Sequence, residues 1–250
     1  VQRLVMEDLG LGTTEVTTQI LQRDRYAELV CALANLASSI DKFSTEIRNL
    51  QRTEIDEARE PFDIKAQIGS SAMPHKVNPV TSENISSLAK VVRSLVQPSL
   101  EAVVTWHERD LTQSAAERFT IPEAFILTDH MLTRIDYVIS NLQVSPARME
   151  RNLELTGGLE LSEALVTALV RKGMERPRAY RLARSLAVES VTKGKSFRDL
   201  AAQEDQVAKL LSPKELQSVF DPRNYLGKTR DLIREALDKT KQERQARGVA

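Results

Sequence analysis

The sequence contains one cysteine, no excess of charge of either sign and no long apolar run. The single Cys31 excludes an internal disulfide, and its place in an apolar segment indicates a buried thiol in a reducing compartment. Lys plus Arg and Asp plus Glu both total 35, so the chain lacks the basic excess typical of nucleic-acid binding. No signal peptide and no stretch long enough to span a membrane is evident. We therefore expect a soluble cytoplasmic protein with neither nucleic-acid nor membrane partners.

Glycine and proline are absent between Gly12 and Pro61, which favours one long helix. Apolar residues recur there at steps of three and four, a heptad pattern over about seven turns. The stripe consists of Tyr26, Leu29, Leu33, Leu36, Ile40, Phe43, Ile47 and Leu50. A stripe of this kind needs partner helices. We predict one from about Ser82, broken at Pro98, and another to about Leu142 with Thr120 as its cap and Pro122 in its first turn.

Beyond Val144 the helices become shorter and are separated by glycine and proline. Gly157-Gly158 interrupts the chain, and Ser212-Pro213-Lys214-Glu215 fits a capping box. No convincing alternating strand is present anywhere. The sequence predicts an all-α fold with a long-helix bundle domain at residues 1–143 and a small C-terminal helical domain at 144–250. Because the first residues, VQRLVMEDLGLG, resemble the last turns of a helix and lack an initiator methionine, we expect the front of a longer protein to be missing.

The stretch GSSAMPHKVNP, residues 69–79, concentrates hydrogen-bonding groups between two helical segments. Its backbone amides, hydroxyls and lysine, just ahead of a helix start, suit an anionic ligand. The alternative is a long connection that glycine and proline merely punctuate. Composition alone leaves both interpretations open. The three histidines are scattered and give no metal-ligand spacing, so we expect neither a metal nor another cofactor.

The order of residues in this stretch resembles the signature loop of the fumarase/aspartase superfamily, G-S-S-x-M-P-x-K-x-N-P, at every fixed position. Further segments are similar to the adenylosuccinate lyase family and cover essentially the whole chain. They are TTQILQRDR at 17–25, LQRTE at 50–54, SEN at 82–84, WHERD at 106–110, SAAER at 114–118, LELTGGL at 153–159 and NYLG at 224–227. Members of the family also carry an earlier domain and a Thr-His segment, neither of which is in this chain.

The resemblance implies a lyase that splits fumarate from adenylosuccinate to leave AMP, and from the analogous succinocarboxamide ribotide of purine synthesis. Such an elimination needs a base, stabilisation of an aci-carboxylate dianion and an acid for the departing nitrogen. By resemblance Ser70 takes the position of the base, and Glu83 that of the carboxylate that orients the acid histidine. Flanking amides, the helix end and Lys76 would have to stabilise the Ser70 alkoxide. Glu83 could otherwise be only a favourable acid in a first helical turn.

The resemblance also assigns the substrate-binding residues. Ser71, Lys76 and Asn78 match positions that bind the succinyl carboxylates; the alternatives are loop capping for the first and third and a solvated cation for Lys76. At the nucleotide end the matching residues are Gln19, Asn84, Arg109, Ser114 and Arg118. Ser114 and Arg118 lie four apart, on one helix face, and could bind a phosphate. Arg109 lies five residues before Ser114 and off that face, and both arginines could instead pair with Glu108 and Glu117, just as Gln19 could be only a helix cap.

The family builds each active site from several subunits of a homotetramer, and its general-acid histidine belongs to the segment that this chain lacks. We therefore expect this chain alone to be an incomplete enzyme with substrate and other copies of itself as partners. Three alternatives remain open. A carboxymuconate cycloisomerase shares a similar loop but has no use for a phosphate clamp. Argininosuccinate lyase usually has Gln-Lys after Met-Pro, and a noncatalytic relative could keep the bundle without the chemistry.

Overall fold

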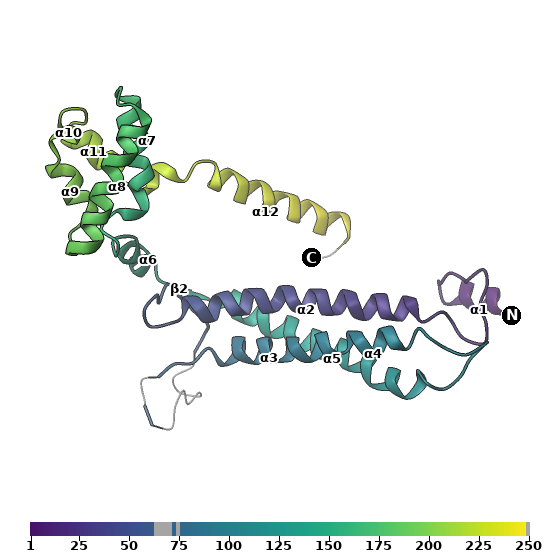
Figure 1. The fold of residues 1–250 in the computed structure, drawn as a ribbon. Helices are drawn as coiled ribbons and strands as arrows, with labels where there is room; N and C mark the ends of the chain where they lie inside the picture. The colour runs from purple at the N-terminus through teal and green to yellow at the C-terminus, as the bar shows by residue number, and fades with distance from the viewer. Residues whose placement is uncertain (63–71, 74–75, 249–250) are drawn as a thin grey trace. The chain divides into compact units, whose positions relative to one another are not determined.

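The computed structural model describes residues 1–62, 72–73 and 76–248, and its chain forms two compact units (Figure 1). Unit 1 is Val1–Arg148 and unit 2 is Met149–Ala250. The all-α fold class is confirmed, and the domain boundary at residue 143 stays a prediction. None of the helices in the described part of the chain is long and apolar enough to cross a membrane.

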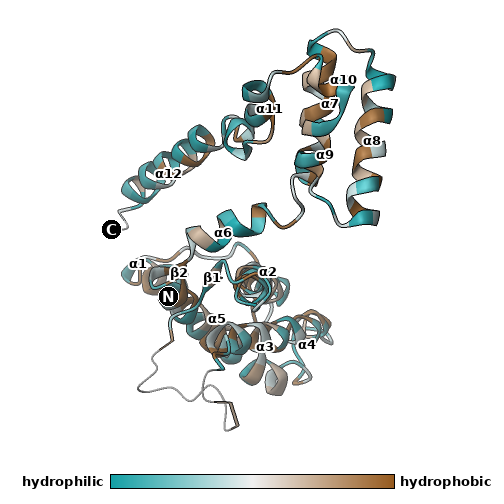
Figure 2. Cartoon of the chain, turned by 90° about the vertical axis from the view of Figure 1, so that its left-hand side faces the viewer, coloured by the Kyte–Doolittle hydropathy of each residue, from teal (hydrophilic) through white to brown (hydrophobic). Residues whose placement is uncertain are grey.

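Unit 1 is built on three helices that pack along one another (Figures 1 and 2). These are α2 (Asp24–Leu50), α3 (Val80–Ser94) and α5 (Ser114–Ser140). Two shorter helices accompany them: α1 (Gln2–Asp8) precedes α2, and α4 (Val96–Glu101) follows α3. Their shared core contains Ala34, Ile40, Ile85, Val92, Met131 and Val138. The long α2 forms because no glycine or proline interrupts it, and it ends at the C-cap Gln51.

The buried face of α2 shares only Ile40 and Ile47 with the stripe that the heptad pattern predicts. The buried residues are Ala27, Val30, Ala34, Ala37, Ile40, Ser44 and Ile47. Leu29, Leu36 and Phe43 of the predicted stripe are 40%, 39% and 59% exposed. Small side chains allow α3 and α5 to approach α2 closely, so they form the contact within the chain. A second, larger apolar stripe therefore remains on the surface of α2. Cys31, in the same helix, is half-buried and not fully buried.

The two prolines of the bundle behave differently. As expected, the helix breaks near Pro98: α3 ends at Ser94, and Pro98 is the third residue of α4, where its missing N–H is tolerated. The predicted start of the next helix is wrong. Helix α5 begins at Ser114, so Thr120 is not a cap but a buried interior residue, and Pro122 lies within the helix. The good helix formers Ala115 to Glu117 extend α5 upstream and outweigh one lost backbone hydrogen bond.

A short antiparallel ladder ties the end of α2 to the end of α5. β1 (Ala58–Arg59) pairs with β2 (Gln143–Val144), with Ala58 opposite Val144 and Arg59 opposite Gln143. The expectation of no strand is wrong to this extent. Beside the ladder, the carboxylate of Asp56 accepts hydrogen bonds from Arg59 Nε at 2.5 Å and Arg148 Nη2 at 3.0 Å. These two contacts, chiefly the one with Arg59, lower the pKa of Asp56.

Unit 2 is a cluster of short helices. They are α6 (Pro146–Leu153, which begins at the end of unit 1), α7 (Ser162–Arg171), α8 (Arg176–Lys193), α9 (Phe197–Gln203), α10 (Asp205–Ala208), α11 (Pro213–Val219) and α12 (Thr229–Ala246), with 3₁₀ turns at Leu159–Leu161 and Pro222–Tyr225. Phe197 and Phe220 meet edge to face in the core, with ring centroids 5.8 Å apart. The predicted capping box of Ser212 and Glu215 is confirmed. Helix α12 buries none of its residues and is largely hydrophilic in Figure 2.

Candidate active site

Three of the predicted site residues line one cavity at the end of unit 1 where α2 stops and α3 starts. The cavity has a volume of about 730 Å³, and Lys76, Asn78 and Glu83 contribute to its wall. Asn78 is half-buried, whereas Lys76 and Glu83 are exposed. Asn84, the next residue along α3, is exposed and does not line the cavity. Ser70 and Ser71 lie outside the described residues.

The start of α3 is held by a carboxylate that sequence reasoning missed. Glu60 is 2% exposed, and its oxygens accept hydrogen bonds from Thr81 N at 2.9 Å, Ser82 N at 2.9 Å and Ser82 Oγ at 2.8 Å. The backbone N–H of Glu60 in turn donates to Oε1 of Gln51 at 3.0 Å. The amides of the first turn of α3 are thus already occupied. The expectation that this helix end supplies positive potential for a ligand is therefore wrong, because Glu60 neutralises it.

The cavity is strongly cationic even though the helix end is neutralised. Five of its lining side chains are basic and two are acidic. Asp56 holds two of the basic ones, Arg59 and Arg148. The other three, Arg48, Arg52 and Lys76, form no ion pair with any residue that the structure describes. Such a cavity can bind an anion through side-chain charges.

The predicted nucleotide end lies in a different part of unit 1. Arg109 belongs to the segment between α4 and α5 and not to a helix, so its five-residue offset from Ser114 does not describe a helix face. Asp110 organises this segment, since its carboxylate accepts hydrogen bonds from Trp106 N at 2.8 Å, Thr112 N at 2.9 Å and Thr112 Oγ1 at 2.5 Å. The hydrogen bond from the Thr112 hydroxyl is the main cause of the lowered pKa of Asp110.

Ser114 and Arg118 lie in the first two turns of α5, four residues apart as expected. Arg109 and Arg118 are exposed and form no ion pair within the described residues. Glu117 instead makes an ionic contact with Arg23 at 2.9 Å, which ties the start of α5 to the start of α2. Gln19 is exposed and precedes α2 by five residues.

The two sets of predicted residues therefore lie at opposite ends of the bundle (Figure 1). Lys76, Asn78 and Glu83 lie where α2 ends, and Arg109, Ser114 and Arg118 lie where α2 begins. Helix α2 has 27 residues, and a rise of about 1.5 Å per residue separates its ends by roughly 40 Å. One copy of the chain cannot bring both sets to the same small molecule.

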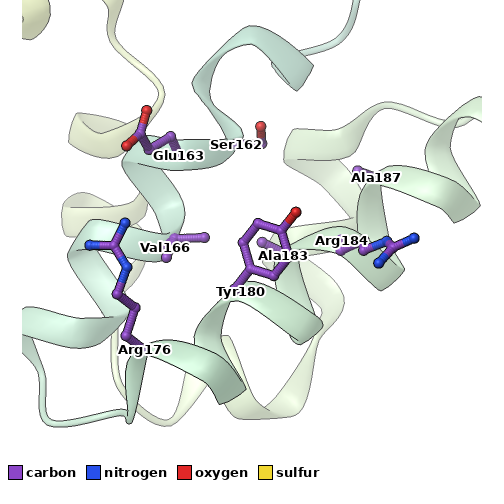
Figure 3. A pocket seen from close by; sticks show the side chains of 8 residues that line it. All are labelled: Ser162, Glu163, Val166, Arg176, Tyr180, Ala183, Arg184 and Ala187. Carbon is purple, nitrogen blue, oxygen red and sulfur yellow. The ribbon is translucent and has the colours of Figure 1, made fainter.

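A further pocket lies wholly within unit 2, between α7 and α8. It has a volume of about 380 Å³ and is lined by Ser162, Glu163, Val166, Arg176, Tyr180, Ala183, Arg184 and Ala187. Figure 3 shows Tyr180 between Arg176 and Arg184, whose charged ends point apart. None of the predicted site residues lines this pocket, and its two guanidinium groups do not converge.

Two family models match the chain. One, described as Lyase, matches residues 1–94, and the other, described as Adenylosuccinate lyase C-terminus, matches residues 158–236. The chain is 44% identical over 240 residues to the adenylosuccinate lyase of Methanothermobacter thermautotrophicus, covering 96% of this chain and 54% of that protein. It is 43% identical to that of Bacillus subtilis, covering 95% of this chain and 54% of the relative. The chain thus spans about half the length of the curated relatives it matches.

Solved structures agree with this classification. The crystal structure of 3-carboxy-cis,cis-muconate lactonizing enzyme from Pseudomonas putida has a TM-score of 0.85 at 33% identity, over 96% of this chain and 52% of that one. A fumarate lyase from Mesorhizobium sp. BNC1 has a TM-score of 0.80 at 30% identity, over 91% of this chain and 49% of that one. The fold is that of the fumarase/aspartase superfamily of lyases. Within this superfamily, the chain belongs to the adenylosuccinate lyase family.

Proposed function

We propose that the full-length protein eliminates fumarate from adenylosuccinate to give AMP, and from the succinocarboxamide ribotide of purine biosynthesis. The observation that carries this proposal is the cationic cavity that contains Lys76, Asn78 and Glu83, in a chain 44% identical to adenylosuccinate lyases. The substrate carries two carboxylates on its succinyl group and a third anionic group, the phosphate. A cavity with more basic than acidic side chains fits the succinyl end.

In the proposed mechanism Ser70 removes the proton beside a succinyl carboxylate. The charge that develops on that carboxylate is stabilised by the ammonium group of Lys76 and the amide of Asn78. Glu83 orients an acid histidine that protonates the departing nitrogen and that this chain does not supply. The reaction needs no metal or other cofactor in this scheme. Cytoplasmic location stays a prediction from composition.

The separation of the two residue sets supports a shared active site. If Arg109, Ser114 and Arg118 bind the phosphate of the same substrate whose succinyl group contacts Lys76, the two sets must come from different copies of the chain. Antiparallel packing of two bundles would bring opposite ends together. The exposed apolar stripe of α2, with Leu29, Leu36 and Phe43, supports packing against further helices. We therefore retain the homotetramer as part of the proposal.

Two single substitutions test the roles. Ser70→Ala in the full-length protein removes a group needed only as the proton leaves, so turnover should fall at least ~10²-fold while substrate affinity barely changes. Arg118→Ala should chiefly weaken AMP and substrate binding, by about 2–4 kcal/mol for a lost charge-assisted contact. An active Ser70→Ala protein would remove the proposed base, and AMP binding that is indifferent to Arg118 would remove the phosphate clamp.

Mixing the two variants tests the shared site. Co-refolding Ser70→Ala with Arg118→Ala subunits creates some sites that take Ser70 from one copy and Arg118 from the other. A hybrid site that takes Ser70 from the Arg118→Ala copy and Arg118 from the Ser70→Ala copy contains both native residues. Turnover should then exceed that of either variant alone. No recovery in mixed oligomers, or a stable monomer of the full-length protein in sedimentation at micromolar concentration, would contradict sharing.

A carboxymuconate cycloisomerase is the second candidate function. It is favoured by the TM-score of 0.85 to the lactonizing enzyme of Pseudomonas putida, although the identity there is 33%. Such an enzyme would not bind AMP. AMP affinity of the wild-type protein, measured by calorimetry beside fumarate release from adenylosuccinate, separates the two candidates, and a noncatalytic relative would show no turnover of either substrate.

A further inference from the structure

We propose that Arg48 is a substrate-binding residue that pairs with a carboxylate of the fumarate moiety. The inference rests on the proposed function and adds a residue from outside the signature loop. Arg48 lies in the last turn of α2, is half-buried and lines the same cavity as Lys76 and Asn78. Its place on a regular helix fixes its backbone before any ligand arrives, which lowers the entropic cost of binding.

The charge pattern of the cavity identifies Arg48 by exclusion. Arg59 and Arg148 already share Asp56. The amides of α3 already have Glu60 as their acceptor. Of the guanidinium groups that line the cavity, those of Arg48 and Arg52 thus lack an acidic partner among the described residues. Arg52 is exposed and follows the end of α2, whereas Arg48 is half-buried within it.

Stabilisation of α2 does not by itself explain a basic residue at position 48. A basic residue in the last turn of a helix is stabilised by the negative end of the helix dipole. However, Arg52 lines the same cavity, and like charges within one cavity repel each other. Lys76 adds a third cation to the same cavity. A dicarboxylate would relieve this repulsion, and a guanidinium group can bind a carboxylate through two parallel hydrogen bonds.

The test measures binding of fumarate and of AMP to the full-length protein by calorimetry. Arg48→Gln should raise the Kd for fumarate by about 10-fold or more, the effect of losing a charge-assisted contact. AMP lacks the succinyl carboxylates, so its Kd should stay within about 2-fold. Arg48→Lys keeps the charge but loses the two-pronged geometry and should lie between the wild type and Arg48→Gln.

Arg59→Gln is the matched control, because it removes the same charge from the same cavity but from a guanidinium group that Asp56 already holds. Its Kd for fumarate should change less than about 3-fold. If Arg48→Gln and Arg59→Gln lose equal affinity for fumarate, the effect comes from the overall positive charge of the cavity, and the inference is overturned. Unchanged fumarate affinity in both Arg48 variants would also overturn it. If Arg48→Gln fails to fold, the Kd of Arg48→Lys for fumarate tests the inference by itself. A wild-type protein that binds no AMP and releases no fumarate from adenylosuccinate refutes the proposed function instead, and fumarate binding still reports on Arg48.

Discussion

Replacing Glu60 should destabilise the start of α3 more than any comparable change at an exposed acid. The side chain is 2% exposed, and three donors point at its two oxygens: Thr81 N, Ser82 N and Ser82 Oγ. All three belong to residues that are themselves buried. In Glu60→Ala these donors lose their acceptor and gain no water in its place. The change therefore differs from the loss of a solvent-exposed helix cap.

The size of the effect follows from these contacts. Each hydrogen bond contributes about 1 kcal/mol net, and a buried donor left without a partner costs about 1–3 kcal/mol. Three donors give an expected loss of about 3–5 kcal/mol in the free energy of unfolding for Glu60→Ala. Glu60→Gln keeps one carbonyl oxygen but turns an amide group toward the remaining donors. We expect it to cost about 1–3 kcal/mol.

Urea-induced unfolding of the full-length protein measures both losses, and hydrogen exchange at Thr81 and Ser82 localises them. Glu54→Ala is the control, because Glu54 is exposed and only six residues away; it should change stability by less than about 0.5 kcal/mol. A Glu60→Ala protein as stable as Glu54→Ala would refute the reasoning. So would a loss of stability without faster exchange at the first turn of α3.

Two further predictions concern unit 2. Gly157→Ala should destabilise it by about 2 kcal/mol or more, because residue 157 has a φ of +59° and its new Cβ would lie 2.9 Å from Cα of Ser196. Gly194→Ala, at a φ of +63° with open space around it, isolates the backbone cost, so equal thermal shifts in both variants would exclude the steric clash. Hydrogen bonds from Lys172 first, and then from Ser212, lower the pKa of Glu215 from 4.5 to about 2. Because the folded pKa is the lower one, this stabilisation is fully present above pH 4.5 and is lost as the pH falls toward 2. An NMR titration of Glu215 should show its pKa rising in Lys172→Gln, and an unchanged value would contradict the assigned cause.

The helices could be predicted from the sequence more reliably than their buried faces. The absence of glycine and proline over 48 positions is a local property, and it predicted α2 correctly. Which face of α2 is buried depends on the neighbouring helices that pack against it. Helix α2 has a stripe of small residues beside a stripe of large ones, and the heptad rule favours the large one. Within one chain the buried face consists mainly of the small residues, together with Val30, Ile40 and Ile47, because small side chains permit close approach of α3 and α5.

The site could be predicted where its residues are neighbours in sequence. Lys76, Asn78 and Glu83 fall within eight positions, and the structure brings them to one cavity. Glu60 was missed because its partners are 21 and 22 residues away and two of its three donors are backbone amides, which leave no pattern in the sequence. Arg48 was missed because a basic residue in the last turn of a helix is an ordinary capping feature. The signal available for Arg48 was a charged residue at a helix end next to the segment LQRTE at 50–54, whereas Glu60 lies far in sequence from the helix that it contacts.

Both ends of unit 1 use an acid in the same way, and this determines which groups remain for a ligand. At one end Glu60 accepts from the amides of α3 and Asp56 holds two arginines. At the other end Asp110 accepts from the amides before α5, and Glu117 contacts Arg23. One end carries Arg48, Arg52 and Lys76, and the other carries Arg109 and Arg118. None of these five forms an ion pair within the described residues, and the two groups lie roughly 40 Å apart. A substrate with carboxylates at one end and a phosphate at the other matches two such groups only when they come from different copies. Under the proposed function, the active site would therefore lie between subunits.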